Sequence, residues 1–148
     1  LKECSIPSAV TSIADYAFAK CSKLTSVVIP REVSSLGVGA FKNCDELSSV
    51  TFAEGNGLTV IAKEAFANSS SLKSITLPAS VKEISESAFK ECTALKSVNF
   101  SANLEKIGAG AFENCIALAT LSEFPATLSE IGDKAFLNTA VTAYSVAE

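Results

Sequence analysis

The sequence predicts a solenoid, a single elongated domain over residues 1–148 in which about six repeats of about 23 residues are stacked. Three observations predict it. The dipeptide Ala-Phe occurs six times, and successive phenylalanines lie 23, 25, 23, 23 and 24 residues apart. An aliphatic residue stands five positions before each Phe, and a small residue stands three positions after it. Fixed periods of this length are typical of arrays in which each repeat contacts its neighbours. The phenylalanines are Phe18, Phe41, Phe66, Phe89, Phe112 and Phe136.

Each repeat opens with a predicted strand. Within residues 72–77, the apolar Ile75 and Leu77 alternate with Ser74 and Thr76, which is the period of a strand with one buried face. Because each repeat supplies one strand in the same direction, we expect a parallel sheet along one wall of the array. The same alternation occurs in residues 24–29, 47–52 and 95–100.

The rest of each repeat is predicted to cross to the opposite wall. A V/L-x-x-I step such as Val81 to Ile84 begins the crossing. Glycine follows the aliphatic residue at Gly37, Gly108 and Gly132, and we expect these glycines to adopt positive φ in a turn. The Ala-Phe stretch predicts one turn of α- or 3₁₀-helix, with the phenylalanines stacked in a buried spine.

Composition and charge exclude several classes of function. The chain has twelve basic residues, of which only Arg31 is an arginine, and a net charge of −4. Nucleic-acid binding needs clustered cations, so no nucleic-acid partner is expected. The apolar runs are too short to span a membrane. The chain begins with Leu1 rather than Met, and we expect it to be a fragment of a longer array.

Residues 72–92 read LKSITLPASVKEISESAFKEC. The recurring pattern, L-x-x-I-x-I-P-x-x-V-x-x-I-G-x-x-A-F-x-x-C, covers the whole chain and resembles the leucine-rich repeat of the BspA-like, or treponemal, type. The commoner leucine-rich repeats carry Asn after the strand, where this chain has Pro, Ala or Ser. The resemblance implies a curved, right-handed leucine-rich-repeat solenoid, an α/β array of mostly short parallel strands with short helical turns. It also implies that the strands line the concave wall.

The resemblance further implies a location at the cell surface, in the periplasm or outside the cell, although the chain carries no targeting signal. Proteins of this type are expected to take part in adhesion or host interaction. By this analogy we expect a non-catalytic interaction module whose strand face binds a protein or glycan. Two alternatives stay open. The chain could be a structural spacer or self-assembly segment, or it could hold a pocket for a small apolar ligand.

The five cysteines do not indicate a metal site. Four of them share the repeat position that small hydroxyl residues fill in the other two repeats, which predicts a buried, compact side chain. Without any His or C-x-x-C pair, the chain lacks the ligands of a zinc site and the parts of a catalytic triad. We expect free thiols, no cofactor, no catalytic residue and no enzyme activity, with a disulfide between neighbouring repeats as the alternative. The shared position holds Cys21, Cys44, Ser69, Cys92, Cys115 and Thr139.

The outward residues of the predicted strands form the candidate binding site. They make two columns of small, mostly hydroxyl-bearing side chains that can exchange hydrogen bonds with a protein segment or a glycan. Lys73 and Lys96 flank the columns. Ser and Thr also suit exposed strand positions without any ligand. The candidate residues are Ser26, Val28, Ser49, Thr51, Ser74, Thr76, Ser97, Asn99 and Thr120.

Two repeats are irregular. Residues 53–57 insert two residues between a strand and its crossing, which predicts a protruding loop, and residues 122–123 add one residue near the fifth strand, which predicts a bulge. Such insertions mark a binding rim or simply a tolerated surface loop. Opposite charges also align between repeats and predict ion pairs. They are Lys82 and Glu83 with Glu105 and Lys106, followed by Glu130.

The two ends of the array are also predicted to matter, because repeat arrays need capping units with a polar outer face. At the start, Leu1, Cys4 and Ile6 are expected to leave an open apolar edge, which favours further repeats or self-association. At the end, a shortened last strand is predicted. Its apolar residues are Val141, Tyr144 and Val146.

Overall fold

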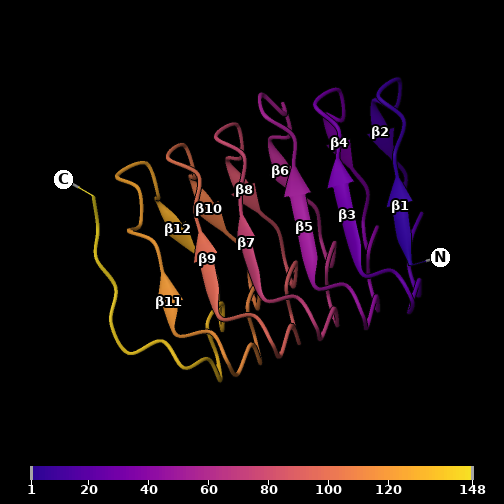
Figure 1. Cartoon of the computed structure of the whole chain (residues 1–148). Helices are drawn as coiled ribbons and strands as arrows, with labels where there is room; N and C mark the ends of the chain where they lie inside the picture. Colours follow the sequence, from indigo (N-terminus) through magenta and orange to yellow (C-terminus); the bar gives the residue numbers. More distant parts are fainter. Residues whose placement is uncertain (1, 148) are drawn as a thin grey trace.

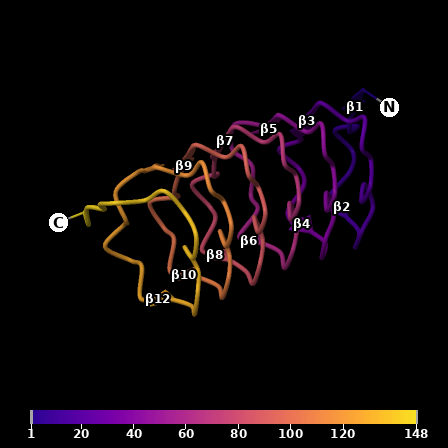
Figure 2. The ribbon, with the colours of Figure 1, turned by 90° about the horizontal axis from the view of Figure 1, so that it is seen from below.

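The computed structural model describes residues 2–147 and shows an elongated stack of turns, with the two chain ends at opposite ends of the stack (Figure 1). Seen from below, the turns follow one another like the windings of a coil (Figure 2). Every strand pairs in parallel with a strand of a neighbouring turn. The predicted solenoid of short parallel strands is therefore confirmed.

The first strand of each turn contributes to one face, which we call the strand wall. Its side chains alternate between core and solvent, as in β3, where Val27 is buried and Val28 is exposed. The strands are β1 (Glu3–Ser5), β3 (Ser26–Ile29), β5 (Ser49–Phe52), β7 (Ser74–Thr76), β9 (Ser97–Asn99) and β11 (Thr120–Leu121).

The second strand of each turn is only two residues long, and these strands form the crossing wall. Each corresponds to the V/L-x-x-I step of the repeat and ends on its aliphatic residue. The strands are β2 (Ser12–Ile13), β4 (Ser35–Leu36), β6 (Val60–Ile61), β8 (Glu83–Ile84), β10 (Lys106–Ile107) and β12 (Glu130–Ile131).

The six Ala-Phe stretches form a third face, the Phe wall, and their rings form the predicted spine. Consecutive rings are almost parallel, with centroids 5.1–5.4 Å apart from Phe18 through to Phe136. Phe41, Phe66, Phe89 and Phe112 are fully buried. Burial of large aromatic side chains in one continuous column supplies much of the apolar core.

The expected helical turn in each Ala-Phe stretch is wrong, since the stretch forms consecutive tight turns and residues 2–147 contain no helix. Alternate N–H groups close turns within the chain, as from Cys21 to the carbonyl of Phe18 at 3.2 Å. The N–H groups between them donate to the next turn, as from Phe18 to Ala40 at 2.8 Å. In a helix all of these N–H groups would donate within their own segment. In the stacked turns, half of them donate to carbonyl groups of the next turn.

This backbone places a residue with positive φ two positions before and two positions after each Phe. In Asn43, for example, φ is 60°. Gly and Asn tolerate this conformation best, and they fill half of the positions. The twelve residues are Tyr16, Lys20, Gly39, Asn43, Glu64, Asn68, Ser87, Glu91, Gly110, Asn114, Lys134 and Asn138.

The expectation of positive φ at Gly37, Gly108 and Gly132 is wrong, because none of them has it. These glycines instead let neighbouring turns approach closely. A Cβ atom at Gly37 would lie 2.3 Å from the backbone nitrogen of Asp15, and one at Gly132 would lie 2.5 Å from that of Ala109.

The irregular third turn interrupts two of the three walls. Before the 53–57 loop, β5 pairs with β3 but has no ladder to β7; after it, β6 pairs with β8 but has no ladder to β4. The loop is held from inside by Asn56, which donates to the carbonyl of Pro30 at 2.7 Å and accepts from Leu58 N–H at 3.0 Å. In this turn, therefore, the strand before the insertion pairs with the preceding turn, and the strand after the insertion pairs with the following turn.

The extra residue at 122–123 also interrupts its turn. β11 ends at Leu121, and the strand wall resumes at Phe124, which forms an isolated parallel bridge with Val146. Phe124 N–H donates to Ser145 at 2.8 Å, so residues 145–147 begin a seventh turn.

All five cysteines are free thiols. The Sγ of Cys44 lies 3.1 Å from the carbonyl of Phe18, and Ser69 places its Oγ 3.1 Å from the carbonyl of Phe41. The predicted equivalence of thiol and hydroxyl at this position is confirmed by these matching hydrogen bonds. Burial raises the pKa of the Cys44 thiol to about 11 and raises that of Cys92 as well.

Candidate functional site

The structure places all nine predicted residues on the strand wall, with their side chains directed away from the core. Seven of them are exposed, while Ser26 and Ser97 are half-buried. Strand register aligns Ser26 with Ser49 and Val28 with Thr51 in one block. A second block aligns the rest as Ser74 with Ser97, Thr76 with Asn99, and Ser97 with Thr120. The expected columns therefore exist, but they are divided at the gap between β5 and β7.

A groove of about 340 Å³ marks that gap. Ser48 donates its hydroxyl to Thr25, but the hydroxyls of Ser49, Thr51 and Ser74 make no hydrogen bond among residues 2–147. The groove is lined by Ser48, Ser49, Val50, Thr51, Phe52, Ser74 and Thr76. Sequence reasoning missed this groove, although the two inserted residues at 53–57 were its signal.

A second hollow of about 240 Å³ continues the groove towards the inserted loop. Phe52 and Thr76 line both hollows, and residues 53–56 line only the second. The loop therefore forms a rim at one end of the groove, where an insertion in a repeat array is expected to contribute to binding.

Ion pairs run along the other faces. Each of six pairs joins a Lys to a Glu about one repeat further along the chain, always in that order. The predicted pairs Lys82–Glu105, at 3.0 Å, and Lys106–Glu130, at 3.2 Å, are confirmed. Glu83 stands in register with Lys106 but accepts a hydrogen bond from Ser85 instead. The other pairs are Lys23–Glu46, Lys42–Glu64, Lys63–Glu86 and Lys90–Glu113.

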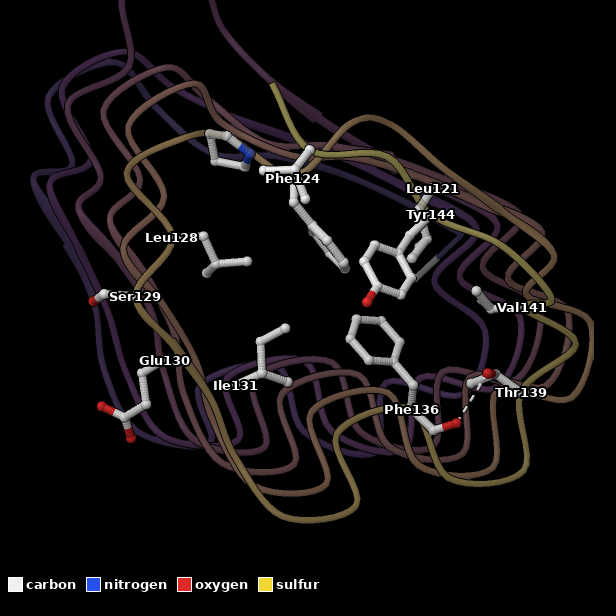
Figure 3. A pocket seen from close by; sticks show the side chains of 12 residues that line it. Leu121, Phe124, Leu128, Ser129, Glu130, Ile131, Phe136, Thr139, Val141 and Tyr144 are labelled. Carbon is white, nitrogen blue, oxygen red and sulfur yellow. Dashed lines mark hydrogen bonds between the residues drawn. The ribbon is translucent and has the colours of Figure 1, made fainter. Parts of the chain in front are cut away.

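A larger cavity, of about 540 Å³, opens at the C-terminal end of the stack. Leu128, Ile131, Phe136 and Tyr144 point into its open centre, whereas Glu130 points away to solvent (Figure 3). Tyr144 is 71% exposed and Ile131 is 49% exposed. The apolar end of the array is thus the last turn, where the next layer of the core is unfilled.

The expected open edge at the N-terminal end is wrong for Ile6, which is buried, and Cys4 is half-buried. Leu1 lies outside the described residues. The two ends also differ in their free backbone groups. At the last turn the N–H groups of Lys134, Phe136 and Asn138 have no acceptor within residues 2–147. The equivalent N–H of Phe112 donates to Ala135 at 2.8 Å.

Three further features of the described residues concern metal binding, buried polar groups and membrane crossing. They contain no cluster of three or more His, Cys, Asp or Glu side chains that could hold a metal ion. Every buried side-chain nitrogen or oxygen in this part of the chain has a hydrogen-bond partner. Residues 2–147 contain no helix that is long and apolar enough to cross a membrane.

The comparison with protein families matches residues 1–119 to the BspA type leucine rich repeat region, in six copies. Among solved structures, a leucine rich cell surface protein from Faecalibacterium prausnitzii A2-165 is 36% identical with a TM-score of 0.77. The match covers 81% of this chain and 31% of that one, so the chain spans about a third of its length.

Two further solved structures are similar. The T. pallidum leucine rich repeat protein is 27% identical with a TM-score of 0.67, over 88% of this chain and 73% of that chain. A leucine-rich repeat protein from Eubacterium ventriosum shares the fold at 24% identity and a TM-score of 0.81, over 97% of this chain and 44% of that chain. No curated protein matches the sequence.

Proposed function

The chain belongs to the BspA-type leucine-rich repeat family, and we propose that it is a non-catalytic interaction module of a surface-exposed or secreted protein. In this proposal the strand wall binds a protein or glycan partner, in adhesion or host interaction. The similar protein from Faecalibacterium prausnitzii is described as a cell surface protein. That likeness supports the location, and the open strand wall supports the mode of binding.

The observation that carries the proposal is the exposure of the strand-wall residues beside a groove. Six strands at a spacing of about 4.8 Å make a face on the order of 25 Å long. Seven of the nine outward residues are exposed, so no described segment covers them. Hydroxyl groups both donate and accept hydrogen bonds, so this face can bind polypeptide or carbohydrate.

The proposal is tested by crowding the strand wall with bulky charges. In one variant Ser49 and Thr51 are replaced by Arg, and in a second Ser74 and Thr76 are. A matched control replaces Ser12 and Ser35, which are also exposed but lie on the crossing wall, by Arg. Partner capture with the full-length protein should fall at least about tenfold for the strand-wall variants, since buried unpaired charges cost several kcal/mol.

Circular dichroism melting curves report whether each variant keeps its fold. If both strand-wall variants capture the partner as well as the control does, the strand wall is not the binding site and the proposal is wrong.

A second candidate function is assembly through the ends, in which the domain is a spacer within a longer array. The cavity at the last turn and its three free N–H groups favour it, because they complement a further turn of the same kind. Appending one repeat copied from residues 79–101 after Ala147 should fill the cavity and raise the melting temperature. An unchanged melting temperature contradicts this, and lipid found in the purified protein by mass spectrometry would instead favour an apolar ligand.

A further inference from the structure

Two exposed lysines stand side by side at the edge of the strand wall. Lys73 and Lys96 directly precede β7 and β9, and Lys96 N–H donates to the carbonyl of Lys73 at 2.8 Å. Neither ammonium forms an ion pair within the described residues. Like charges on neighbouring strands destabilise a sheet, so stability alone does not favour this pair.

Most of the other nine lysines are in ion pairs. Six of them pair with a Glu one repeat away, at N–O distances of 2.6–3.2 Å, and the remaining three, Lys2, Lys20 and Lys134, do not lie side by side on neighbouring strands. The protein as a whole is acidic, with a net charge of −4. Lys73 and Lys96 therefore form a positive spot on a negatively charged molecule, beside the predicted binding columns.

The groove between β5 and β7 begins next to this spot. Lys73 N–H reaches the carbonyl of Ser48, one of the residues that line the groove, at 3.4 Å. Beyond that contact no ladder joins β5 to β7, and the hydroxyls of Ser49, Thr51 and Ser74 make no hydrogen bond within the described residues. An extended polypeptide carries the amide groups that satisfy such donors and acceptors.

We propose that this region binds an acidic polypeptide segment, with its backbone in the groove and two carboxylates on Lys73 and Lys96. The proposal rests on the strand-wall function proposed above and names the chemistry of its partner. The exposed aromatic side chains of the described residues are Tyr16 and Tyr144, and neither lines the groove. Phe52 does line the groove, but it is half-buried and packed against the core. A sugar ring would therefore find no fully exposed aromatic face for stacking, which favours polypeptide over an anionic glycan.

The test uses a fluorescent peptide of alternating Glu and Gly residues, with an otherwise identical Gln and Gly peptide for comparison. Fluorescence anisotropy at low ionic strength measures binding to the chain. Replacing Lys73 and Lys96 by Glu should lower the affinity for the Glu peptide at least about tenfold, because two attractions become repulsions. The matched control replaces Lys20 and Lys134 by Glu. They have no ion-pair partner among the described residues, and the affinity should change less than about twofold.

Several results would overturn the proposal. They are an equal loss in both double variants, no loss in K73E/K96E, or equal binding of the Glu and Gln peptides. Preferential binding of a heparin oligosaccharide that K73E/K96E abolishes would show that the lysines serve an anionic glycan instead. If the Arg variants lose the natural partner while K73E/K96E keeps it, the strand-wall function holds and the acidic partner is wrong.

Discussion

The Phe wall and the strand wall belong to the same six turns, yet they respond differently to an irregular repeat. On the Phe wall, the N–H of Phe18, Phe41 and Phe66 each donates to the next turn at 2.8 Å, and the ladder passes the third turn unbroken. The strand wall loses its ladder at that turn. The wall that carries the aromatic spine keeps the register of the array, and the other walls absorb the insertion.

The largest expected effect comes from the spine. Phe89 is fully buried between Phe66 and Phe112, with ring centroids 5.4 and 5.3 Å away. Phe89→Ala should lower the free energy of unfolding by about 3–5 kcal/mol, since it removes a large buried side chain and leaves a cavity. Urea unfolding followed by circular dichroism measures the loss. Ser74→Ala on the strand wall should change the free energy of unfolding by no more than about 0.5 kcal/mol. Similar losses of stability in both variants would show that the two walls do not differ in this respect.

The anchor of the inserted loop is expected to rank second. Asn56 is 5% exposed and donates to the carbonyls of Pro30 and Val33 while accepting from Leu58. Asn56→Ala should cost about 1–3 kcal/mol, because these buried main-chain groups lose their partner. Amide hydrogen exchange should also quicken in the loop. Gly57→Ala, next to it in open space, is the control and should leave both measurements unchanged.

A buried cysteine beside the spine is expected to make the stability of the Phe wall depend on pH. Burial raises the pKa of Cys44 from 9.0 to about 11. The folded protein therefore keeps this proton between those values while the unfolded chain releases it, so stability falls as pH rises from 9 to 11. The loss should shrink in Cys44→Ser, since Ser69 fills the equivalent position in another turn. An unchanged pH profile in that variant would show that Cys44 does not set it.

The ion pairs are expected to contribute least. Lys82 and Glu105 are 3.0 Å apart, with side chains 58% and 52% exposed. Lys82→Ala should change stability by only about 0.2–1 kcal/mol, and the difference should fade in high salt because exposed pairs are screened. Lys134→Ala removes a lysine without a partner among the described residues and serves as the control. A salt-independent loss at Lys82 would point to packing of its methylenes rather than charge.

Much of the fold was predictable because it depends on periodicity. The spacing of the phenylalanines predicted the spine, and the alternation in residues 72–77 predicted which side chains of β7 are buried. The tight turns were missed because an i, i+3 pattern of small and aromatic residues also suits a helix. Asn43, Asn68 and Asn114 were the available signal, since Asn tolerates positive φ.

The candidate site was predictable only in part. Exposure of Ser49 and Thr76 follows from strand alternation, which each strand determines for itself. The groove between them depends on which neighbour β5 and β6 choose, and that choice involves hydrogen bonds from residues in three turns. An apolar pocket was one of the alternatives that the sequence left open, but its position at the last turn could not be predicted, because it depends on where Tyr144 lies relative to Phe136.

The main-chain hydrogen bonds that join neighbouring turns of the Phe wall all donate towards the C-terminal end of the stack, and each ion pair sets Lys before Glu in that same sense. A gene that duplicates or deletes one whole repeat preserves both arrangements at the new junction. Insertion of only part of a repeat would move the N–H groups of one turn out of register with the carbonyl groups of the next. Evolution can therefore lengthen or shorten such a protein in steps of one repeat, while the outward residues of the strand wall are free to diversify.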